Sequence, residues 1–219
     1  IFSQANYEAA YGMIGREENG EEEPMQKWFD ISGVVPGADK GFIHGLSILN
    51  DGKYSASTKT NRMDFTLTRS PIYAHHDPYI PKEDWDYRYV DQGEQRFNYS
   101  LYYHEGPVQN SRVAREAWEI NQKPIMNFET FHEGPLAQRF SFLESDNEQI
   151  IVSVFKIAED GEGYVLRAYE SMNKAQSNRI RIPSLDVTIE ENFQPGEIKT
   201  FLIKDKSYQE ILMTELDKD

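Results

Sequence analysis

The chain has 219 residues, of which 38% are hydrophobic, 13% are aromatic and 27% are charged. It contains no cysteine, which excludes a disulfide-stapled scaffold, a thiolate zinc site and a cysteine nucleophile. The 37 acidic and 23 basic residues give a net charge of −14, and this field repels phosphate backbones. With no apolar run near the roughly 20 residues of a membrane helix, we expect neither a nucleic-acid nor a membrane partner.

Alternation of apolar and polar side chains predicts strands along most of the chain. The expected strands are 42–49, 53–58, 62–69, 96–104, 150–157, 164–169, 179–182, 187–189 and 200–203. The first two are separated by a turn at residues 50–52, where Asn and Gly tolerate a positive φ, and Pro71 ends the third. The acidic stretch 17–24 and the segment 75–91 are expected to be loops. Strands at this spacing favour an antiparallel β-sandwich or barrel over βαβ units.

One segment departs from the strand pattern. Residues 111–122 carry apolar side chains at helical spacing, with Ser111 as the expected N-cap and Pro124 as the stop. The C-terminal stretch 208–216 is expected to form either a second short helix or a tail that docks on a sheet. We therefore expect one all-β domain over residues 1–219 with one or two short helices, and with 204–219 as its C-terminal tail.

Catalytic motifs are absent from the sequence. Two histidines and a carboxylate occur together only at residues 75–77, and neighbouring side chains in an extended chain point to opposite faces. We expect a solvated loop there rather than a metal site. There is no nucleophile elbow, and Ser70 precedes a proline without an obvious base. A glycosidase needs two carboxylates, but with 37 acidic residues the count of pairs decides nothing.

Two segments are candidate binding surfaces. In the loop 75–91, Tyr79, Trp85 and Tyr87 interleave with acidic residues. Sugar rings stack on aromatic faces while carboxylates accept their hydroxyls, so these residues could form a sugar platform; alternatively the loop buries its own aromatics against the sandwich. Arg69 stands at the end of a predicted strand, where its guanidinium could position a substrate oxygen, pair with a carboxylate of another domain, or form a surface ion pair.

Seven runs, in order and with matching spacing, resemble the C-terminal β region of glycoside hydrolase family 38, the α-mannosidases. The runs are 20–33, 45–54, 67–73, 91–94, 97–101, 104–106 and 163–170. The resemblance covers about residues 11–203 and implies a large antiparallel β-sandwich of the galactose-mutarotase-like supersandwich type. It also implies that the complete enzyme hydrolyses terminal α-linked mannose by double displacement, with zinc and an aspartate nucleophile in an N-terminal barrel.

The family's zinc-ligand and nucleophile motifs do not occur in this sequence. The resemblance therefore implies a chain without catalytic or metal-binding residues that is inactive alone and packs on the barrel of the same polypeptide. Its ligand would be a mannose-containing oligosaccharide, contacted at the rim of the active site. By the resemblance, Arg69 and Ser70 come nearest to the mannose, and Asn50, Asp51 and Tyr54 occupy the best-matched turn.

Residues 75–90 look like an insertion relative to the family, so the resemblance implies no role for the aromatic loop. Because the chain starts with Ile1 rather than Met, we expect it to be an excised part of a longer protein. The lack of cysteine and of an export signal leads us to expect a cytoplasmic location. A stand-alone carbohydrate-binding module and a purely structural interaction domain remain alternatives, and homo-oligomerisation stays open.

Overall fold

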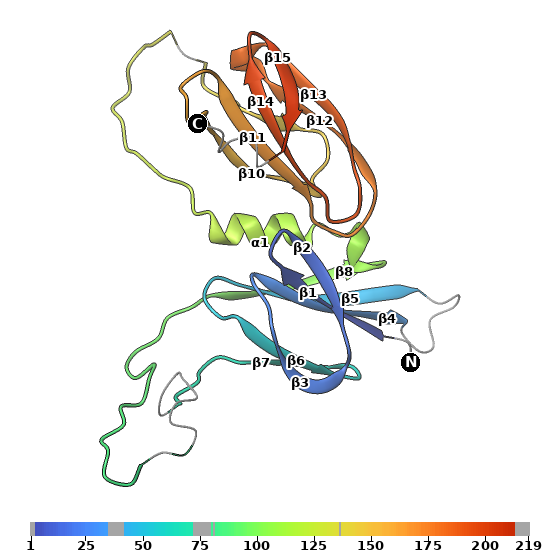
Figure 1. Ribbon diagram of the computed structural model, residues 1–219, viewed down its shortest axis with the longest axis vertical. Helices are drawn as coiled ribbons and strands as arrows, with labels where there is room; N and C mark the ends of the chain where they lie inside the picture. The colour runs from blue at the N-terminus through green and yellow to red at the C-terminus, as the bar shows by residue number, and fades with distance from the viewer. Residues whose placement is uncertain (1–2, 35–41, 72–79, 81, 136, 213–219) are drawn as a thin grey trace.

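The computed structural model describes residues 3–34, 42–71, 80, 82–135 and 137–212. Within them the chain forms fifteen strands, one α-helix and two short 3₁₀ helices, η1 (Val108–Asn110) and η2 (Pro183–Leu185). Every strand pair is antiparallel. The strands gather in two units, β1 to β8 and β9 to β15, and the α-helix lies between them (Figure 1).

The N-terminal unit is a sandwich of a five-stranded and a three-stranded sheet. Sheet A has the order β2 (Gly12–Arg16), β1 (Ser3–Ala9), β4 (Trp28–Val34), β5 (Ile43–Asn50), β8 (Tyr99–Glu105). Sheet B has the order β3 (Asn19–Pro24), β6 (Ser55–Lys59), β7 (Arg62–Phe65). Alternation along the strands sends Tyr7 and Phe29 of sheet A toward Ala56, Met63 and Phe65 of sheet B. These side chains form the core of the sandwich.

The C-terminal unit repeats this design with its own core. Sheet D has the order β10 (Ile150–Ile157), β11 (Tyr164–Glu170), β14 (Ile198–Lys204), β15 (Ser207–Ile211). Sheet C has the order β13 (Val187–Phe193), β12 (Gln176–Ile182), β9 (Glu144–Ser145). Leu166 and Phe201 of sheet D pack with Ile180, Ile189 and Phe193 of sheet C, and all five side chains are buried.

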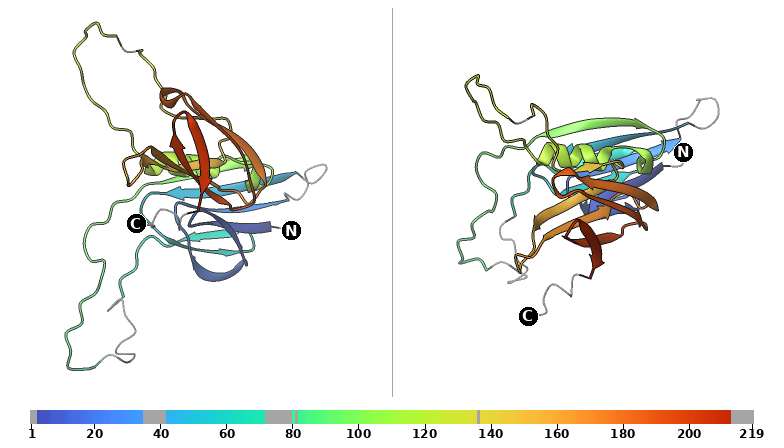
Figure 2. Two further views of the ribbon diagram at one scale, coloured as in Figure 1. Left: turned by 45° about the horizontal axis from the view of Figure 1, so that its top comes forward. Right: turned by 90° about the horizontal axis from the view of Figure 1, so that it is seen from above.

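Helix α1 (Val113–Asn121) fastens the two units together (Figure 2). Val113 and Ala117 pack against Trp28 of sheet A, and Met172 from the C-terminal unit joins the same buried cluster. The Trp118 indole N–H donates to the Tyr169 hydroxyl at 2.8 Å, which links the helix to sheet D. The helix is therefore covered by apolar side chains of both units.

The structure confirms the all-β, sandwich-like fold and the single helix near residues 111–122. It corrects three expectations. The acidic stretch expected as a loop forms β3 over 19–24, because backbone pairing with β6 satisfies its N–H and C=O groups while its charges stay at the surface. Ser111 is not the N-cap, since the helix begins after Arg112, and the strand expected over 62–69 ends at Phe65, before Pro71. Of the two alternatives for 208–216, the helix is wrong and the tail on a sheet is right, since residues 207–211 pair with β14 as a strand; residues 213–219 lie outside the described residues. In the described part, no helix is long and apolar enough to span a membrane.

Asp30 is the centre of a buried polar network on sheet A. Its carboxylate accepts hydrogen bonds from Ser32 and from Ser47, the latter at 2.8 Å, and lies 2.8 Å from Nε2 of His104. The other ring nitrogen of His104 lies 3.0 Å from the Gly106 carbonyl oxygen. Both ring nitrogens of His104 therefore have a hydrogen-bonding partner inside the protein. A Cβ on Gly45, the residue opposite, would stand 2.2 Å from the His104 ring, which explains the glycine.

Replacing His104 with alanine tests this network. Because the substitution leaves the buried Asp30 carboxylate without the histidine ring 2.8 Å away, we expect a loss of about 3–5 kcal/mol in the free energy of unfolding. Urea denaturation of the two proteins measures this difference in the free energy of unfolding. Glu105→Ala, on the exposed neighbour, should change stability by less than about 0.5 kcal/mol. Equal effects of the two substitutions would contradict the interpretation.

Candidate functional site

The turn at Asn50 is built by the side chain of that residue. Asn50 is 1% exposed, and its Oδ1 accepts hydrogen bonds from the backbone N–H groups of Gly52 at 3.0 Å and Lys53 at 2.6 Å. Its Nδ2 donates to the Gln26 carbonyl at 3.2 Å. The Asn50 carbonyl accepts a 2.9 Å hydrogen bond from Asn121 at the end of α1. Asn50, which the sequence suggested as a sugar contact, thus shapes the turn from inside.

Asp51 and Tyr54 lie on the outer side of the same turn. The Asp51 carboxylate accepts hydrogen bonds from the Asn98 backbone at 2.6 Å and the Asn98 side chain at 2.7 Å. These two bonds hold the pKa of Asp51 below its ordinary value, with a smaller contribution from Lys123. Tyr54 is 66% exposed. The turn therefore exposes the Tyr54 ring to solvent, while the Asp51 carboxylate binds Asn98 just before β8.

A hollow of about 690 Å³ adjoins this turn, and we call it the Tyr54 hollow. Its walls include Tyr54, Trp118 and a buried ion pair between Glu8 and Lys27. The Lys27 ammonium lies 2.9 Å from Glu8 and 4.5 Å from the centroid of the Trp118 ring. Burial raises the pKa of Glu8, against the opposing effect of Lys27. Aromatic walls and paired charges suit the binding of a polar ligand better than acid–base catalysis.

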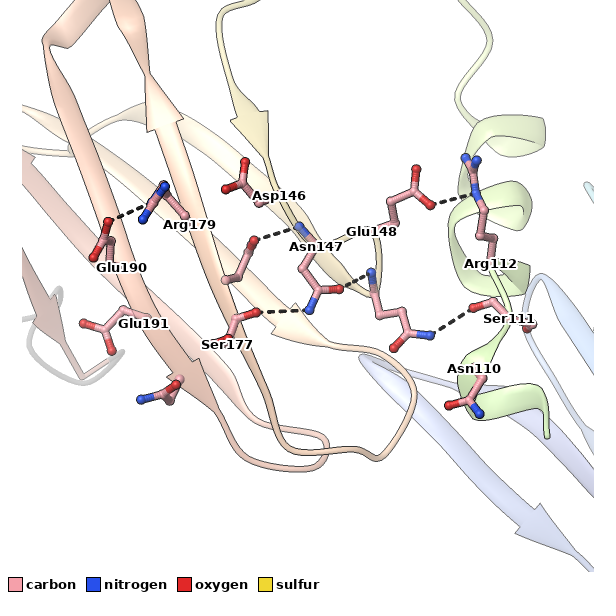
Figure 3. A pocket seen from close by; sticks show the side chains of 13 residues that line it. Asn110, Ser111, Arg112, Asp146, Asn147, Glu148, Ser177, Arg179, Glu190 and Glu191 are labelled. Carbon is pink, nitrogen blue, oxygen red and sulfur yellow. Dashed lines mark hydrogen bonds and ion pairs between the residues drawn. The ribbon is translucent and has the colours of Figure 1, made fainter. Parts of the chain in front are cut away.

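A second, larger hollow of about 920 Å³ opens between the start of α1 and sheet C (Figure 3). Its described lining is entirely polar, and its carboxylates are engaged by cations. Arg112 lies 2.9 Å from Glu148, and Arg179 lies 2.7 Å from Glu190. Asn147 ties the loop before β10 to β12 by donating to the Ser177 carbonyl at 3.1 Å. With no aromatic wall and its charges paired, this hollow lacks both a sugar platform and a free acid–base pair.

Sequence reasoning missed the polar hollow for a physical reason. Its lining comes from four segments, residues 110–112, 146–149, 177–179 and 190–192. Each contributes three or four ordinary polar residues with no motif spacing. Only the packing of α1 against the C-terminal unit brings the four segments together.

Arg69 and Ser70 follow sheet B and stand apart from the Tyr54 hollow, whose lining contains neither. Both residues are exposed. The Ser70 hydroxyl accepts a 2.9 Å hydrogen bond from the Gln92 side chain. Arg69 lies near Glu22 of β3, whose pKa is lowered mainly by hydrogen bonds from Ser55 and Thr66 and partly by the Arg69 charge. The structure therefore does not gather the predicted contact residues in one pocket.

The described part of the aromatic loop, residues 82–91, lies away from both units (Figure 1). Trp85 is 61% exposed, and its ring centroid lies 6.3 Å from that of Tyr87 at an interplanar angle of 32°. The Lys82 ammonium lies 4.9 Å from the Trp85 ring, and the Lys82 backbone N–H donates to the Tyr87 hydroxyl at 2.8 Å. Tyr79, the third predicted platform residue, lies outside the described residues. Of the two remaining rings, Trp85 is exposed and Tyr87 is half-buried.

Among the described residues, no group of three or more His, Asp or Glu side chains is placed to hold a metal ion. The histidines at 75 and 76 lie outside the described residues. Serine, histidine and aspartate do meet at Asp30, but the Ser47 hydroxyl donates to the carboxylate rather than to His104. All three side chains are buried, so the cluster has the wrong connectivity and no access for a nucleophilic attack.

Comparison with known proteins finds similarity to one family of glycoside hydrolases. Residues 3–81 match the family model described as the glycosyl hydrolases family 38 C-terminal domain. Alpha-mannosidase G of Dictyostelium discoideum is 28% identical over 219 residues, and the match covers 94% of this chain and 18% of the relative. This chain is homologous to the C-terminal part of family 38 α-mannosidases. The sequence resemblance that predicted this relationship is confirmed.

Other relatives of family 38 agree. Alpha-mannosidase 2C1 of Homo sapiens is 27% identical over 180 residues, covering 77% of this chain and 15% of the relative. A solved α-mannosidase from Enterococcus faecalis V583 shares the fold with a TM-score of 0.67 and 17% identity, over 92% of this chain and 24% of that one. A second solved structure, a family 38 protein from Enterococcus faecalis, matches with a TM-score of 0.68 over 92% of this chain and 25% of that one. The chain thus spans less than a fifth of the curated relatives.

The role of Asn50 can be separated from that of Tyr54 by substitution. Asn50→Ala removes the acceptor for two backbone N–H groups and a donor to a backbone carbonyl at a buried position. We therefore expect it to lower the free energy of unfolding by about 2–3 kcal/mol. Tyr54→Ala, at the exposed ring, should cost less than about 0.5 kcal/mol. Thermal or urea unfolding measures both, and a neutral Asn50→Ala would show that the turn forms without this side chain.

Proposed function

We propose that this chain is the C-terminal β part of an α-mannosidase that hydrolyses terminal α-linked mannose. The observation that carries the proposal is the pattern of coverage. The match to Alpha-mannosidase G extends over 94% of this chain but only 18% of the relative. In such an enzyme the catalytic groups would lie outside residues 1–219, in a barrel on which this β part packs.

The contents of the described hollows support a non-catalytic role. The carboxylates of the polar hollow are paired with arginine or lysine, and Glu8 in the Tyr54 hollow is paired with Lys27. A glycosidase needs one carboxyl group free to protonate the leaving oxygen and a second free to act as nucleophile or base. The described donor set does not fit a zinc ion either. The proposal therefore assigns both zinc and nucleophile to the other domain.

Two surfaces of this chain could reach the rim of an active site. Arg69 and Ser70 are exposed in the segment that leaves sheet B, and a guanidinium offers donors to sugar hydroxyls or to a carboxylate across the domain interface. Tyr54 offers a free ring beside the Tyr54 hollow. The proposal gives these residues a positioning role for a mannose-containing oligosaccharide.

The isolated chain should not hydrolyse an aryl α-mannoside, because the carboxylates that line its two described hollows are paired with lysine or arginine. Release of the aryl alcohol, followed spectroscopically with and without a chelator, measures this. Turnover that persists in chelator and disappears in Glu190→Gln or Glu148→Gln would place catalysis in this chain and defeat the proposal.

Arg69→Ala tests the rim contact in the complete enzyme. Loss of a charged hydrogen bond to substrate or to the catalytic domain should lower kcat/KM by about tenfold or more, since such a bond contributes about 1.5–3 kcal/mol. The melting temperature of the isolated chain should not change, because Arg69 is exposed. Arg62→Ala, an exposed arginine on β7, is the matched control. Unchanged kinetics in Arg69→Ala would remove this residue from the site.

A second candidate function rests on the exposed Trp85 ring, which lies 6.3 Å from the Tyr87 ring. An exposed aromatic ring beside carboxylates is typical of carbohydrate-binding modules, and residues 82–91 lie away from the sandwich (Figure 1). In that case the chain would bind mannose oligosaccharides by itself.

Calorimetry of the isolated chain with mannose oligosaccharides distinguishes the two functions. A binding module should show a dissociation constant of about 1 mM or lower, lost in Trp85→Ala and kept in Tyr89→Ala, whose ring is 58% exposed. The proposed role as an enzyme part predicts no measurable heat. Binding that is abolished by Trp85→Ala would favour the module.

A further inference from the structure

The two sheets of the N-terminal sandwich differ in width. Sheet A has five strands and sheet B has three. The buried side chains between them come from β1, β4 and β6 and from Met25 between β3 and β4. Ile31, Ile48, Met63 and Phe65 pack at the margin of this cluster. The core therefore extends under sheet B from β1 as far as Ile48 on β5. Beyond that point sheet A continues without a described layer above it.

The uncovered part of sheet A carries an apolar surface, which we call the open shelf. It consists of Leu46 on β5 and of Tyr99, Leu101 and Tyr103 on β8, which are 39%, 57%, 64% and 60% exposed. The register places Tyr103 beside Leu46 and Leu101 beside Ile48, so the shelf shares its face with the buried core. Its only described polar contact is a hydrogen bond between the Tyr103 hydroxyl and the ring of His44. The shelf is thus a continuation of the core that lacks a cover.

Both sheets end at open edges around the shelf. β8 is the last strand of sheet A and β7 the last strand of sheet B in the described part. Phe65 at the end of β7 meets the Tyr99 ring edge-to-face with 6.5 Å between centroids, which marks the boundary between the covered and uncovered parts. The described residues 82–98 between β7 and β8 lie away from the shelf for most of their length (Figure 1). Further strands beside β7 would lie directly over the shelf.

The size and charge of the shelf favour a tethered cover over a second copy of the chain. Taking about 200 Å² for each side chain, the four exposed fractions correspond to roughly 400–500 Å². This matches the largest apolar patches of ordinary proteins but is well below the roughly 800 Å² that each partner buries in a stable dimer. Two chains of charge −14 also repel each other. A segment of the same polypeptide needs no bimolecular association and is not subject to these limits.

We propose that the open shelf is covered by an extended segment of the same polypeptide outside residues 1–219, which adds to the β7 edge of sheet B and packs alternate apolar side chains on Leu101 and Tyr103. This inference rests on the proposed function in one respect, namely that the chain is part of a longer protein. The relatives leave room for such a segment, because this chain spans only 15–25% of their lengths. The edge strand supplies backbone hydrogen bonds, and the shelf supplies the apolar contact.

Cysteine accessibility tests the cover, because the chain has no native cysteine. Leu101→Cys places a thiol on the shelf, and Ile157→Cys, at 63% exposure on β10, is its match elsewhere. In the isolated chain both should react with a maleimide at rates within about threefold of each other. In the longer protein the rate at Leu101→Cys should fall by about tenfold or more from its isolated value. Leu46→Cys gives a second shelf position should Leu101→Cys fail to fold.

The outcomes separate this inference from the proposed function. An unchanged rate at Leu101→Cys in a longer protein that hydrolyses α-mannosides would overturn the cover and leave the function standing. Protection at Leu101→Cys in a longer protein without that activity would support the cover and refute the function. Protection that is already present in the isolated chain and disappears on dilution would identify a second copy on the shelf and overturn the inference.

Discussion

Sheet A must be covered on both faces, and most of the structure follows from how this is achieved. On one face, Tyr7 and Phe29 pack under the three strands of sheet B. On the other, Trp28 and Leu49 pack against α1 and Met172, which couples the sheet to the C-terminal unit. A sheet with apolar side chains on both faces cannot be exposed to water on either without cost. The covered parts of both faces form two of the buried clusters of the chain. The open shelf on β5 and β8 is the apolar part of sheet A that no described residue covers.

The same packing places the candidate site. Helix α1 ends at Asn121, whose side chain donates to the Asn50 carbonyl and to the Ala117 carbonyl. One residue thereby ties the helix end to the turn that carries Tyr54, and the Tyr54 hollow forms where the helix, the turn and β1 meet. The buried Glu8 carboxylate in that hollow is paired with Lys27. This pairing supports the proposal that the chain serves a catalytic domain elsewhere.

Much of the fold could be predicted from the sequence, but the site could not. The strands at 43–50 and 55–59 follow from alternation around an Asn-Asp-Gly turn, and the helix from its 3.6-residue period. Strand β3 was missed because three successive glutamates look like a solvated loop, and only pairing with β6 makes them a strand. Asn50 was taken as a sugar contact because the family match is best there. Its burial was not visible in the sequence, although Asn two residues before Gly is itself typical of a side-chain-supported turn.

The central claim is that residues 1–219 complete a glycosidase without performing its chemistry. The most direct measurement is hydrolysis of an aryl α-mannoside by the longer protein, by the same protein lacking residues 1–219, and by that shortened protein after the isolated chain is added back. The account predicts activity in the first, loss to background in the second and at least partial recovery in the third. Full activity of the shortened protein would contradict it.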